Sequence, residues 1–438
     1  MTLFVGSNIV KGNINDGMDV ETAMKLGRLL GKVYGSPIAV AMDGRTSNQM
    51  LKGALTSGIM SVGCDVMDLG MVPTPLIQYY MTLHPEIKGG VTITASFAGP
   101  DINGFRIMKS GGVEDPIFDE LTLDSIMNVE KGTVSGTNAG EILKVADFTE
   151  NYIASILSKV DVDAIRQAGL RICLDCRNSA VASIASSILL NLSINCITIG
   201  GDRSVFNDDR LEKLGHLVRS QELDLGVAIE MDADHVLFAS SDGKPVSGDK
   251  SFAIIAKSIL DQNKGKIVIP INSTTLMEDV IRDNGGTIIH TEVGEQSMVM
   301  KVKENEALLG GDVFGCIVIP VDQVCTCDAM LVMVKMIEII VKNGPLAELD
   351  KSLPDYYIAR DMFECPEEQI EPTLNRFREM HNGEKMELVD GIKLFKDDGW
   401  ILVRHSNVKG VIKIYAQANT KETAEEWTKQ TIRGLKID

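Results

Sequence analysis

Short apolar runs alternate with helical spacings of apolar residues along most of the chain. Near the N-terminus, Pro37–Met42 is an apolar run, and Asn48–Gly63 shows apolar residues at helical spacing. The alternation continues with a strand at Cys64–Leu69, a helix at Leu76–Leu83 and a strand at Val91–Ala95. This β-α-β-α order predicts a parallel sheet covered by helices.

The alternation restarts twice and then changes. The second block has strands at Arg171–Asp175, Cys196–Ile199, Leu225–Ile229 and His235–Ala239 and a helix at Ala180–Leu190. The third has helices at Asp249–Gln262 and Thr274–Asn284 and strands at Lys266–Pro270 and Thr287–Thr291. The end of the chain has strands at Gly391–Phe395, Trp400–Val403 and Val411–Ala416 and a helix at Lys421–Leu435. We therefore expect three similar α/β domains with mixed, largely parallel sheets (residues 1–147, 148–248 and 249–361) and a smaller α+β domain (362–438).

Composition narrows the class of protein. The 438 residues are 44% hydrophobic and 24% charged, with a formal net charge of −18, which argues against partners such as nucleic acid or an anionic membrane. The longest apolar stretch, Ala329–Val341, contains Lys335 and Glu338 and predicts a buried helix rather than a membrane span. Eight cysteines without a second CxxC pair favour structural thiols over zinc, and no signal-peptide pattern opens the chain. We expect a cytoplasmic protein, and a homo-oligomer is compatible with the sequence.

Two segments combine a strand end with reactive groups. In TITASFAGPDINGF, Ser96 follows a predicted strand and precedes Gly99 and Pro100, so it is either a nucleophile at a strand tip or an ordinary turn serine; we call residues 94–101 the serine loop. In AIEMDADHVLF, three alternate carboxylates lie between two apolar runs, and we call Glu230–His235 the acidic turn. Oxygen ligands converging in this way suit Mg²⁺, and the alternative is a solvated hairpin turn.

Two further loops are weaker signals. LLGGDVFGC contains what we call the aspartate loop, Asp312–Cys316, whose glycines are equally compatible with a simple turn. VRHSNVKGVIKIYA contains the arginine loop, residues 404–410, where Arg404, Ser406, Asn407 and Lys409 offer the donors that phosphate recognition needs. Its alternative is a surface hairpin with two cations.

The order of these four loops resembles the α-D-phosphohexomutase superfamily, which comprises phosphoglucomutases, phosphomannomutases and phosphoglucosamine mutases. The resemblance covers essentially the whole chain and includes LKGALTSGIMSVGCDVMDLGMVPTPLIQYYM, SSDGKPVSGDKSFAIIAKSIL, NEALLGGD and DDGWILVRHS. It implies four domains around a central cleft. It also implies that Ser96 is a phosphoserine that passes its phosphoryl group to a sugar monophosphate and recovers the other one from a bisphosphate intermediate.

The resemblance assigns roles to the other loops. One Mg²⁺ ion would bridge the phosphoserine and the acidic turn, and it would neutralise charge during transfer. The ligands implied for it are Ser96, Glu230, Asp232 and Asp234, with Arg106 and His235 as further catalytic positions. Lys11, Arg45, Asp312, Phe314 and Cys316 fall on substrate-binding positions, and Arg404, Ser406, Asn407 and Lys409 fall on the phosphate-binding loop.

The departures from the superfamily motifs fall on the chemistry. In the serine motif TASHNP, Phe97 and Ala98 replace histidine and asparagine. Arg106 replaces the lysine that follows NGF, and arginine cannot act as a general base. Lys11 replaces an arginine near the N-terminus, and the metal motif DGDGDR is changed at Glu230, Met231, Ala233 and His235. In the aspartate loop, Asp312, Phe314 and Cys316 depart from GEMSGH. In the arginine loop, Asn407 and Lys409-Gly410 depart from RPSGTEP.

Two hypotheses follow from this pattern. Since Ser96, Asp232, Asp234, Arg404 and Ser406 are present, the chain is expected to be a phosphosugar mutase, an isomerase of the phosphotransferase type, with an altered sugar substrate. The alternative is a noncatalytic paralogue that binds a sugar phosphate or a partner protein. A phosphate on Ser96 would indicate catalytic competence.

Overall fold

The computed structural model describes residues 4–6, 9–95, 98–115, 123–132, 134–176, 180–200, 208–406 and 410–436. The chain divides into two compact units. Unit 1 comprises Met1–Val246 and Val321–Ala347, and unit 2 comprises Ser247–Pro320 and Glu348–Asp438.

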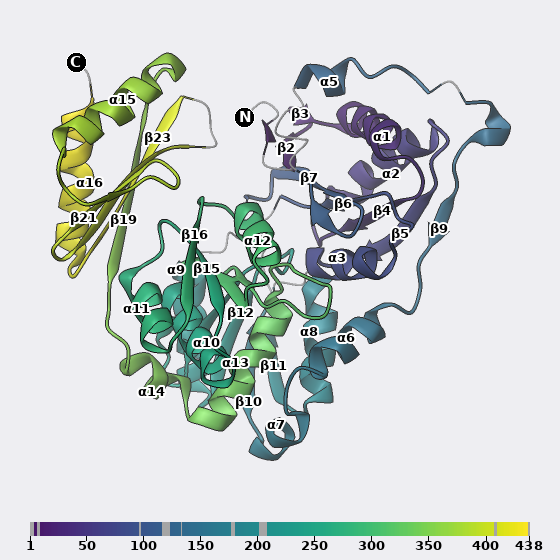
Figure 1. Ribbon diagram of the computed structural model, residues 1–438. Coiled ribbons are helices and arrows are strands. Elements are labelled where there is room, and N and C mark those ends of the chain that lie inside the picture. Colours follow the sequence, from purple (N-terminus) through teal and green to yellow (C-terminus); the bar gives the residue numbers. More distant parts are fainter. Residues whose placement is uncertain are drawn as a thin grey trace. The chain divides into compact units, whose positions relative to one another are not determined.

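The first sheet of unit 1 is mixed, with the order β1-β2-β7-β6-β4-β5-β9, and β3 and β8 pair with β2 and β7. Its strands are β1 (Phe4–Gly6), β2 (Ile9–Ile14), β3 (Gly17–Met18), β4 (Ile38–Met42), β5 (Val66–Met71), β6 (Gly89–Ile93), β7 (Ile102–Lys109), β8 (Val113–Glu114) and β9 (Ile142–Lys144). Its helical segments are α1 (Val20–Tyr34), α2 (Asn48–Met60), α3 (Thr74–Leu83), α5 (Leu123–Met127) and the 3₁₀ turn η1 (Gly136–Asn138). Helices α1 and α2 pack their apolar side chains on one face of this sheet, and α3 lies on the other face (Figure 1).

The second sheet of unit 1 has the order β11-β10-β12-β13-β14. Its strands are β10 (Arg171–Asp175), β11 (Asn195–Ile199), β12 (Leu225–Ile229), β13 (Val236–Ser240) and β14 (Pro245–Val246). Five helices accompany it: α6 (Thr149–Leu157), α7 (Val162–Ala168), α8 (Ala180–Asn191), α9 (Asp208–Ser220) and α13 (Ala329–Asn343). Strands β10, β11 and β12 are parallel, whereas β12 and β13 form an antiparallel hairpin around the acidic turn.

Unit 2 contains the third sheet, in the order β16-β15-β17-β18. Its elements are α10 (Gly248–Gln262), β15 (Lys266–Pro270), α11 (Thr275–Asp283), β16 (Thr287–Thr291), α12 (Glu295–Glu304), β17 (Leu309–Gly311) and β18 (Ile317–Val318). The short helix α14 (Leu346–Lys351) lies where the chain passes from unit 1 into unit 2. The pairs β15–β16 and β15–β17 are parallel, and β17–β18 is antiparallel.

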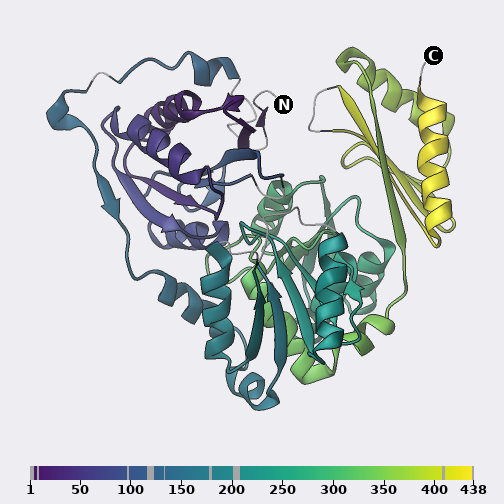
Figure 2. The same ribbon diagram turned by 180° about the vertical axis from the view of Figure 1, so that it is seen from behind.

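The fourth sheet, also in unit 2, is wholly antiparallel, with the order β19-β23-β22-β21-β20. Its elements are β19 (Tyr357–Glu364), α15 (Glu367–Met380), β20 (Met386–Glu387), β21 (Ile392–Lys396), β22 (Gly399–His405), β23 (Val411–Ala418) and α16 (Lys421–Leu435). One face packs on α15 and α16 through a cluster that includes Phe377, Val403 and Ile414. Figure 2 shows α16 alongside the strands of this sheet. The other face holds Trp400, Leu402 and Tyr415, which pack with Ile271.

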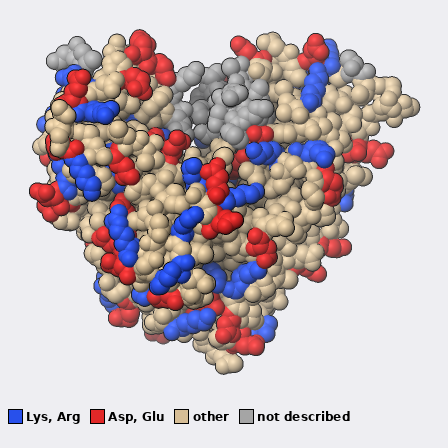
Figure 3. Space-filling model, in the orientation of Figure 1, with Lys and Arg blue, Asp and Glu red and all other residues tan. Residues whose placement is uncertain are grey.

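These four sheets confirm the predicted fold class of three mixed, largely parallel α/β sheets and a C-terminal antiparallel sheet domain. The residue limits predicted for the four domains stay predictions. Every helix among the described residues is too short or too polar to span a membrane. Acidic and basic side chains are interspersed over the face seen in Figure 3.

Candidate active site

The serine loop connects two antiparallel neighbours in the first sheet, β6 and β7. Ser96 and Phe97 lie outside the described residues, and backbone hydrogen bonds hold the segments on either side of them. Thr94 donates its N–H to the Gly104 carbonyl (3.0 Å), and Ile102 donates its N–H to the Gly99 carbonyl (3.1 Å). The two ends of the loop are therefore fixed by the sheet.

Asn103-Gly104 lies inside β7. A side chain at residue 104 would meet the backbone of β2, because an added Cβ atom would lie 2.6 Å from the Val10 carbonyl oxygen. Glycine is thus needed here for the close approach of two strands rather than for a turn. The buried Asn103 amide donates to Ser47 Oγ (2.8 Å) and Asn48 Oδ1 (2.6 Å), which ties β7 to the start of α2.

Arg45 holds the segment that follows Ser96. Its Nη1 donates to the carbonyls of Gly99 and Ile102, and its Nη2 donates to the carbonyl of Ala98, all at 3.0 Å. Arg45 also pairs with the buried Asp43 (Nε–Oδ2 3.3 Å) and is itself only 7% exposed. Burial raises the pKa of Asp43, and Arg45 opposes that shift. These contacts support a role in positioning the serine loop, and the expected contact of Arg45 with substrate stays a prediction.

Removing this buried cation should destabilise unit 1. We expect Arg45→Met to lower the free energy of unfolding by about 3 kcal/mol, because it leaves the Asp43 carboxylate buried without its cation. Adding Asp43→Asn should restore part of the loss, since the uncompensated charge then disappears. Urea unfolding of the two variants and the wild type measures both effects, and a loss below about 1 kcal/mol for Arg45→Met would contradict the assignment.

The acidic turn is buried, which rules out the solvated hairpin that was its alternative. Glu230, Asp232 and Asp234 are only 2%, 0% and 1% exposed. The turn closes through the Glu230 N–H, which donates to the His235 carbonyl (3.1 Å). Ala233 has a positive φ of 62°, a left-handed conformation that costs a non-glycine residue about 1–2 kcal/mol. The turn thus keeps its shape without the glycine of the related motif.

Two cationic side chains contact the carboxylates of this turn. Arg106 leaves β7 and places Nη1 2.8 Å from Asp234 Oδ2 and 3.8 Å from Asp232 Oδ2, while its Nε lies 3.1 Å from Glu114 Oε1. His235 Nδ1 lies 2.7 Å from Asp234 Oδ1 and 3.2 Å from Glu230 Oε2. Arg106 therefore joins the strand after the serine loop to the acidic turn.

These charges shift one another's protonation. Burial alone would lower the pKa of His235, but the carboxylates of Asp234 and Glu230 outweigh it and hold that pKa well above its ordinary value. Burial alone would raise the pKa of Asp234, yet His235 and Arg106 keep it well below its usual range. Burial and the charges of Asp234 and Glu230 both raise the pKa of Asp232. Lys11 on β2 has its pKa lowered by burial and by the charge of Arg106.

The donor set of the acidic turn fits a divalent cation. Ligand atoms of Glu230, Asp234 and His235 lie within 4.8 Å of one another. Both carboxylate oxygens of Asp232 are buried, and neither has a hydrogen-bond partner among the described residues. An unsatisfied buried carboxylate is costly unless something positive binds it, so Asp232 is suited to a metal ion.

The N-terminus of α13 packs against the acidic turn. Ala329 donates its N–H to the Ala233 carbonyl (3.0 Å). Asp328 caps this helix by accepting from the N–H groups of Met330 and Leu331, and its carboxylate also accepts from the Tyr152 hydroxyl at 2.9 Å. Burial raises the pKa of Asp328 to about 6, although these hydrogen bonds oppose the shift.

Asp328 should make stability fall as the pH rises. The folded state binds an extra proton between the unfolded carboxyl pKa near 4 and about 6, so this stabilisation is present at low pH and lost above about 6. Asp328→Asn should therefore gain up to about 3 kcal/mol relative to wild type between pH 4 and pH 8. Urea unfolding across this range tests it, with the exposed Asp322→Asn as control; a pH-independent difference would contradict the assignment.

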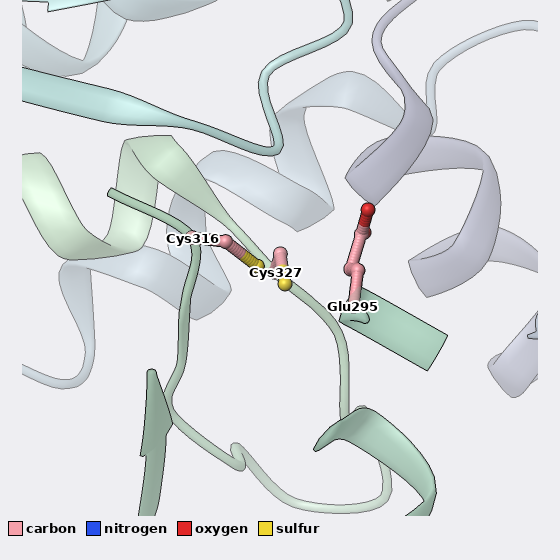
Figure 4. Close-up of side chains that lie close together, drawn as sticks. All are labelled: Glu295, Cys316 and Cys327. Carbon is pink, nitrogen blue, oxygen red and sulfur yellow. The ribbon is translucent and has the colours of Figure 1, made fainter. Parts of the chain in front are cut away.

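In unit 2, the aspartate loop is shaped by its own carboxylate. Asp312 Oδ1 accepts from the N–H groups of Phe314 (2.8 Å) and Cys316 (3.1 Å). The guanidinium of Arg360, on β19, stacks on the Phe314 ring, with Cζ 4.0 Å from the ring centroid. Cys316 is fully buried and disulfide-bonded, as is Cys327, so it offers no thiol to a sugar hydroxyl. Figure 4 shows the side chains of Cys316, just before β18, and of Glu295, at the start of α12.

The arginine loop follows β22. Arg404 is buried and pairs through Nε with Asp390 Oδ2 (2.7 Å), which also accepts from the Val293 N–H. Ser406 is also buried and donates its N–H to the Val411 carbonyl, closing the hairpin between β22 and β23. Asn407 and Lys409 lie outside the described residues.

Two further cations near this loop, Lys413 and Arg360, were not predicted from the sequence. Lys413 on β23 is the register partner of Arg404, and Arg360 pairs with Tyr415, so the three cations belong to one face of the fourth sheet. Burial and the charges of Arg404 and Arg360 lower the pKa of Lys413. Lys413 could have been found from the sequence, because the hairpin between the two predicted strands pairs it with Arg404. The sequence around Arg360 gives no indication that it lies on the same sheet face.

Comparison with known proteins decides the family. Models of the phosphoglucomutase/phosphomannomutase α/β/α domains I, II and III match residues 3–131, 150–243 and 247–357. The chain belongs to the phosphoglucomutase/phosphomannomutase family. A "Probable phosphoglucosamine mutase" of Methanopyrus kandleri is 30% identical over 440 residues, which cover 97% of this chain and 96% of the relative.

Solved structures of the phosphoglucomutase/phosphomannomutase family share the fold. A family protein from Burkholderia thailandensis has a TM-score of 0.84 and 21% identity, covering 98% of this chain and 96% of the other. The N-acetylphosphoglucosamine mutase of Aspergillus fumigatus, solved with GlcNAc-6P and magnesium, has a TM-score of 0.57 and 13% identity, covering 91% and 83%. The family models and the full-length match to the Methanopyrus kandleri relative both indicate a sugar-phosphate mutase of this family.

Proposed function

We propose that this chain is a phosphosugar mutase that moves a phosphoryl group between positions of a sugar phosphate through a phosphoserine at Ser96 and a bisphosphate intermediate. The observation that supports this most is the buried acidic turn, whose Asp232 carboxylate has no hydrogen-bond partner among the described residues. Arg106 ties this turn to the strand that follows the serine loop. A buried cluster of this kind suits charge stabilisation during phosphoryl transfer.

The residues of the serine loop and the acidic turn, together with Arg106, are proposed to carry out the phosphoryl transfer. The Ser96 hydroxyl oxygen takes and returns the phosphoryl group. Glu230, Asp232 and Asp234 would hold Mg²⁺, with Ser96, and the ion supplies positive charge to the phosphoryl oxygens. Arg106 stays protonated and acts electrostatically rather than as a base. His235 is held in its charged form by its carboxylate neighbours, so it can offer a proton to the leaving oxygen.

Residues of unit 2 are proposed to bind the substrate. Arg404, Ser406, Asn407 and Lys409 would bind a phosphate group, and Lys413 and Arg360 add positive charge to the same sheet face. In the aspartate loop, Asp312 already accepts from two N–H groups of its own loop, and Phe314 presents an apolar ring. We therefore expect poor recognition of hexose hydroxyls, and a compact or less hydroxylated sugar phosphate as the better substrate.

The features of the aspartate loop also favour a second candidate function. A chain that binds a sugar phosphate without turning it over would have no need for hydroxyl recognition at Asp312, Phe314 and Cys316. An isomerisation assay over hexose, hexosamine and pentose phosphates with Mg²⁺ separates the two. Turnover of any of these substrates, with phosphate on Ser96 by mass spectrometry, supports the mutase, and binding without turnover supports the noncatalytic paralogue. Rapid turnover of glucose 1-phosphate would contradict the expected substrate preference.

Arg404 should provide much of the affinity for the phosphate group. A charge-assisted hydrogen bond to phosphate contributes about 1.5–3 kcal/mol, so Arg404→Met should weaken binding of a sugar phosphate by about 10- to 150-fold. Isothermal titration calorimetry measures the change. Arg376→Met, which removes one exposed cation from α15, is the matched control and should leave the affinity unchanged. Equal affinities of the two variants would exclude Arg404 from the phosphate site.

A further inference from the structure

Arg106 occupies the position from which a cation would neutralise the acidic turn. Its side chain is largely buried, at 8% exposure for the residue, and it contacts carboxylates from two separate segments. One is Glu114 on β8 (3.1 Å from Nε), and the others are Asp234 (2.8 Å) and Asp232 (3.8 Å) of the acidic turn, both measured from Nη1. A guanidinium keeps its charge at any pH at which the protein is folded.

The same oxygens are those that a divalent cation needs. Asp234 has Arg106 on Oδ2 and His235 on Oδ1, and Glu230 has His235 on Oε2. Among the described residues, neither oxygen of Asp232 has a hydrogen-bond partner, and Arg106 Nη1 approaches its Oδ2 to 3.8 Å. A metal ion bound here would have to share Asp234 with Arg106 and would be repelled by its charge at short range.

We propose that Arg106 is a built-in counter-ion that competes with the divalent cation for Asp232 and Asp234. The acidic turn then binds Mg²⁺ or Mn²⁺ weakly, and tight binding requires the guanidinium to move aside. This inference rests on the proposed function only in taking the acidic turn as the metal site. It adds that the metal affinity of this chain is determined by a residue that is not a ligand.

Metal binding to the full chain tests the competition directly. Every protein carries Ser96→Ala, so that a phosphoserine does not contribute, and Mn²⁺ affinity is measured by calorimetry and by the electron paramagnetic resonance signal of unbound Mn²⁺. We expect Arg106→Met to bind Mn²⁺ at least about tenfold more tightly than the parent, because a charge next to the site is removed. Lys159→Met, which removes a cation paired with Asp322 elsewhere in unit 1, should change the affinity by less than about twofold.

Two further variants make the result decisive. Asp232→Asn added to Arg106→Met should abolish the gain, and a gain that persists there would arise at another site and overturn the proposal. Arg106→Lys keeps the charge but loses the planar guanidinium that contacts both Asp234 and Glu114. Its affinity for Mn²⁺ should therefore be about threefold or more above that of the parent. If Arg106→Met does not fold, as judged by circular dichroism, Arg106→Lys decides. Mn²⁺ affinity equal to that of the parent in the folded variants overturns the proposal.

Failure of this inference and failure of the proposed function can be told apart. The measurement uses no sugar phosphate and no turnover, so a chain without mutase activity still shows or lacks the gain in Mn²⁺ affinity. Conversely, the wild-type protein can be an active mutase while its Arg106 variants bind Mn²⁺ no better than the parent. In that case the proposed function stands and only the counter-ion role of Arg106 is overturned.

Discussion

Replacing Ser96 with alanine should abolish mutase turnover while leaving the protein folded. The alanine side chain has no oxygen to take the phosphoryl group, so the bisphosphate intermediate does not form. Loss of a covalent nucleophile typically lowers turnover by about 10⁴-fold or more, and we expect a change of that size. The measurement is the isomerisation assay on the best substrate of the hexose, hexosamine and pentose phosphate panel.

The matched control for this variant is Ser110→Ala. Ser110 lies on the exposed turn after β7, and its hydroxyl makes one long hydrogen bond, to the Pro85 carbonyl (3.4 Å). It should keep wild-type turnover, and its intact mass should retain the phosphoryl group that Ser96→Ala lacks. Turnover that survives Ser96→Ala would contradict the phosphoserine mechanism. Wild-type protein without phosphate and without turnover would favour the noncatalytic paralogue.

Asp232→Asn should lose activity and gain stability. Its carboxylate is fully buried without a hydrogen bond, and burial together with the charges of Asp234 and Glu230 raises its pKa. Removing a charged group that stabilises the transition state should lower turnover by about 10²–10³-fold. Without Mg²⁺, the neutral amide should raise the free energy of unfolding by about 1–3 kcal/mol, because Arg106 approaches Asp232 only to 3.8 Å and compensates its buried charge only in part.

The pH dependence gives this prediction a second check. An acid whose pKa is raised in the folded state destabilises the protein above that pKa and not below it. The stability gain of Asp232→Asn in urea unfolding with chelator should therefore shrink as the pH falls. Asp209→Asn, an exposed carboxylate on α9, is the control and should change neither turnover nor stability. A destabilised Asp232→Asn would contradict this expectation, because it would mean that the attraction of Arg106 outweighs the cost of burying the carboxylate.

Local patterns predicted most of the sheet strands well. Strands β10, β12, β15 and β16 begin and end at the predicted residues. The first three are almost wholly buried, and a strand covered on both faces is a continuous apolar run between turn residues. Helix α1 was not predicted, although Asp19 caps its first turn by accepting from the Thr22 N–H. The reason for a glycine at residue 104 did not follow from the sequence, since local sequence does not show that β2 packs against it.

In the candidate site, the positions of the four loops could be predicted from the sequence, but their contacts could not. Their positions followed from the sequence because each lies where an apolar strand ends and polar residues begin, and the motif order indicated the family. The contacts did not follow. Arg45 bonds to carbonyls more than fifty residues away, and Glu114 pairs with Arg106, a role that no motif suggested. The sugar contact expected of Asp312 stays a prediction, and the two hydrogen bonds that its Oδ1 accepts from its own loop did not follow from the sequence.

By itself, the sequence determined the fold class, the family and the segments that hold the chemistry, because hydrophobic periodicity and motif order are local properties of the chain. Only the tertiary structure decided the electrostatics of those segments. Arg106 and Asp234 are 128 residues apart in the chain and 2.8 Å apart in space, and Phe314 stacks with Arg360 from a different sheet. Burial and charge pairing depend on which segments meet in space. The acidic turn is therefore a buried, partly neutralised cluster, whereas its sequence is equally compatible with an exposed hairpin.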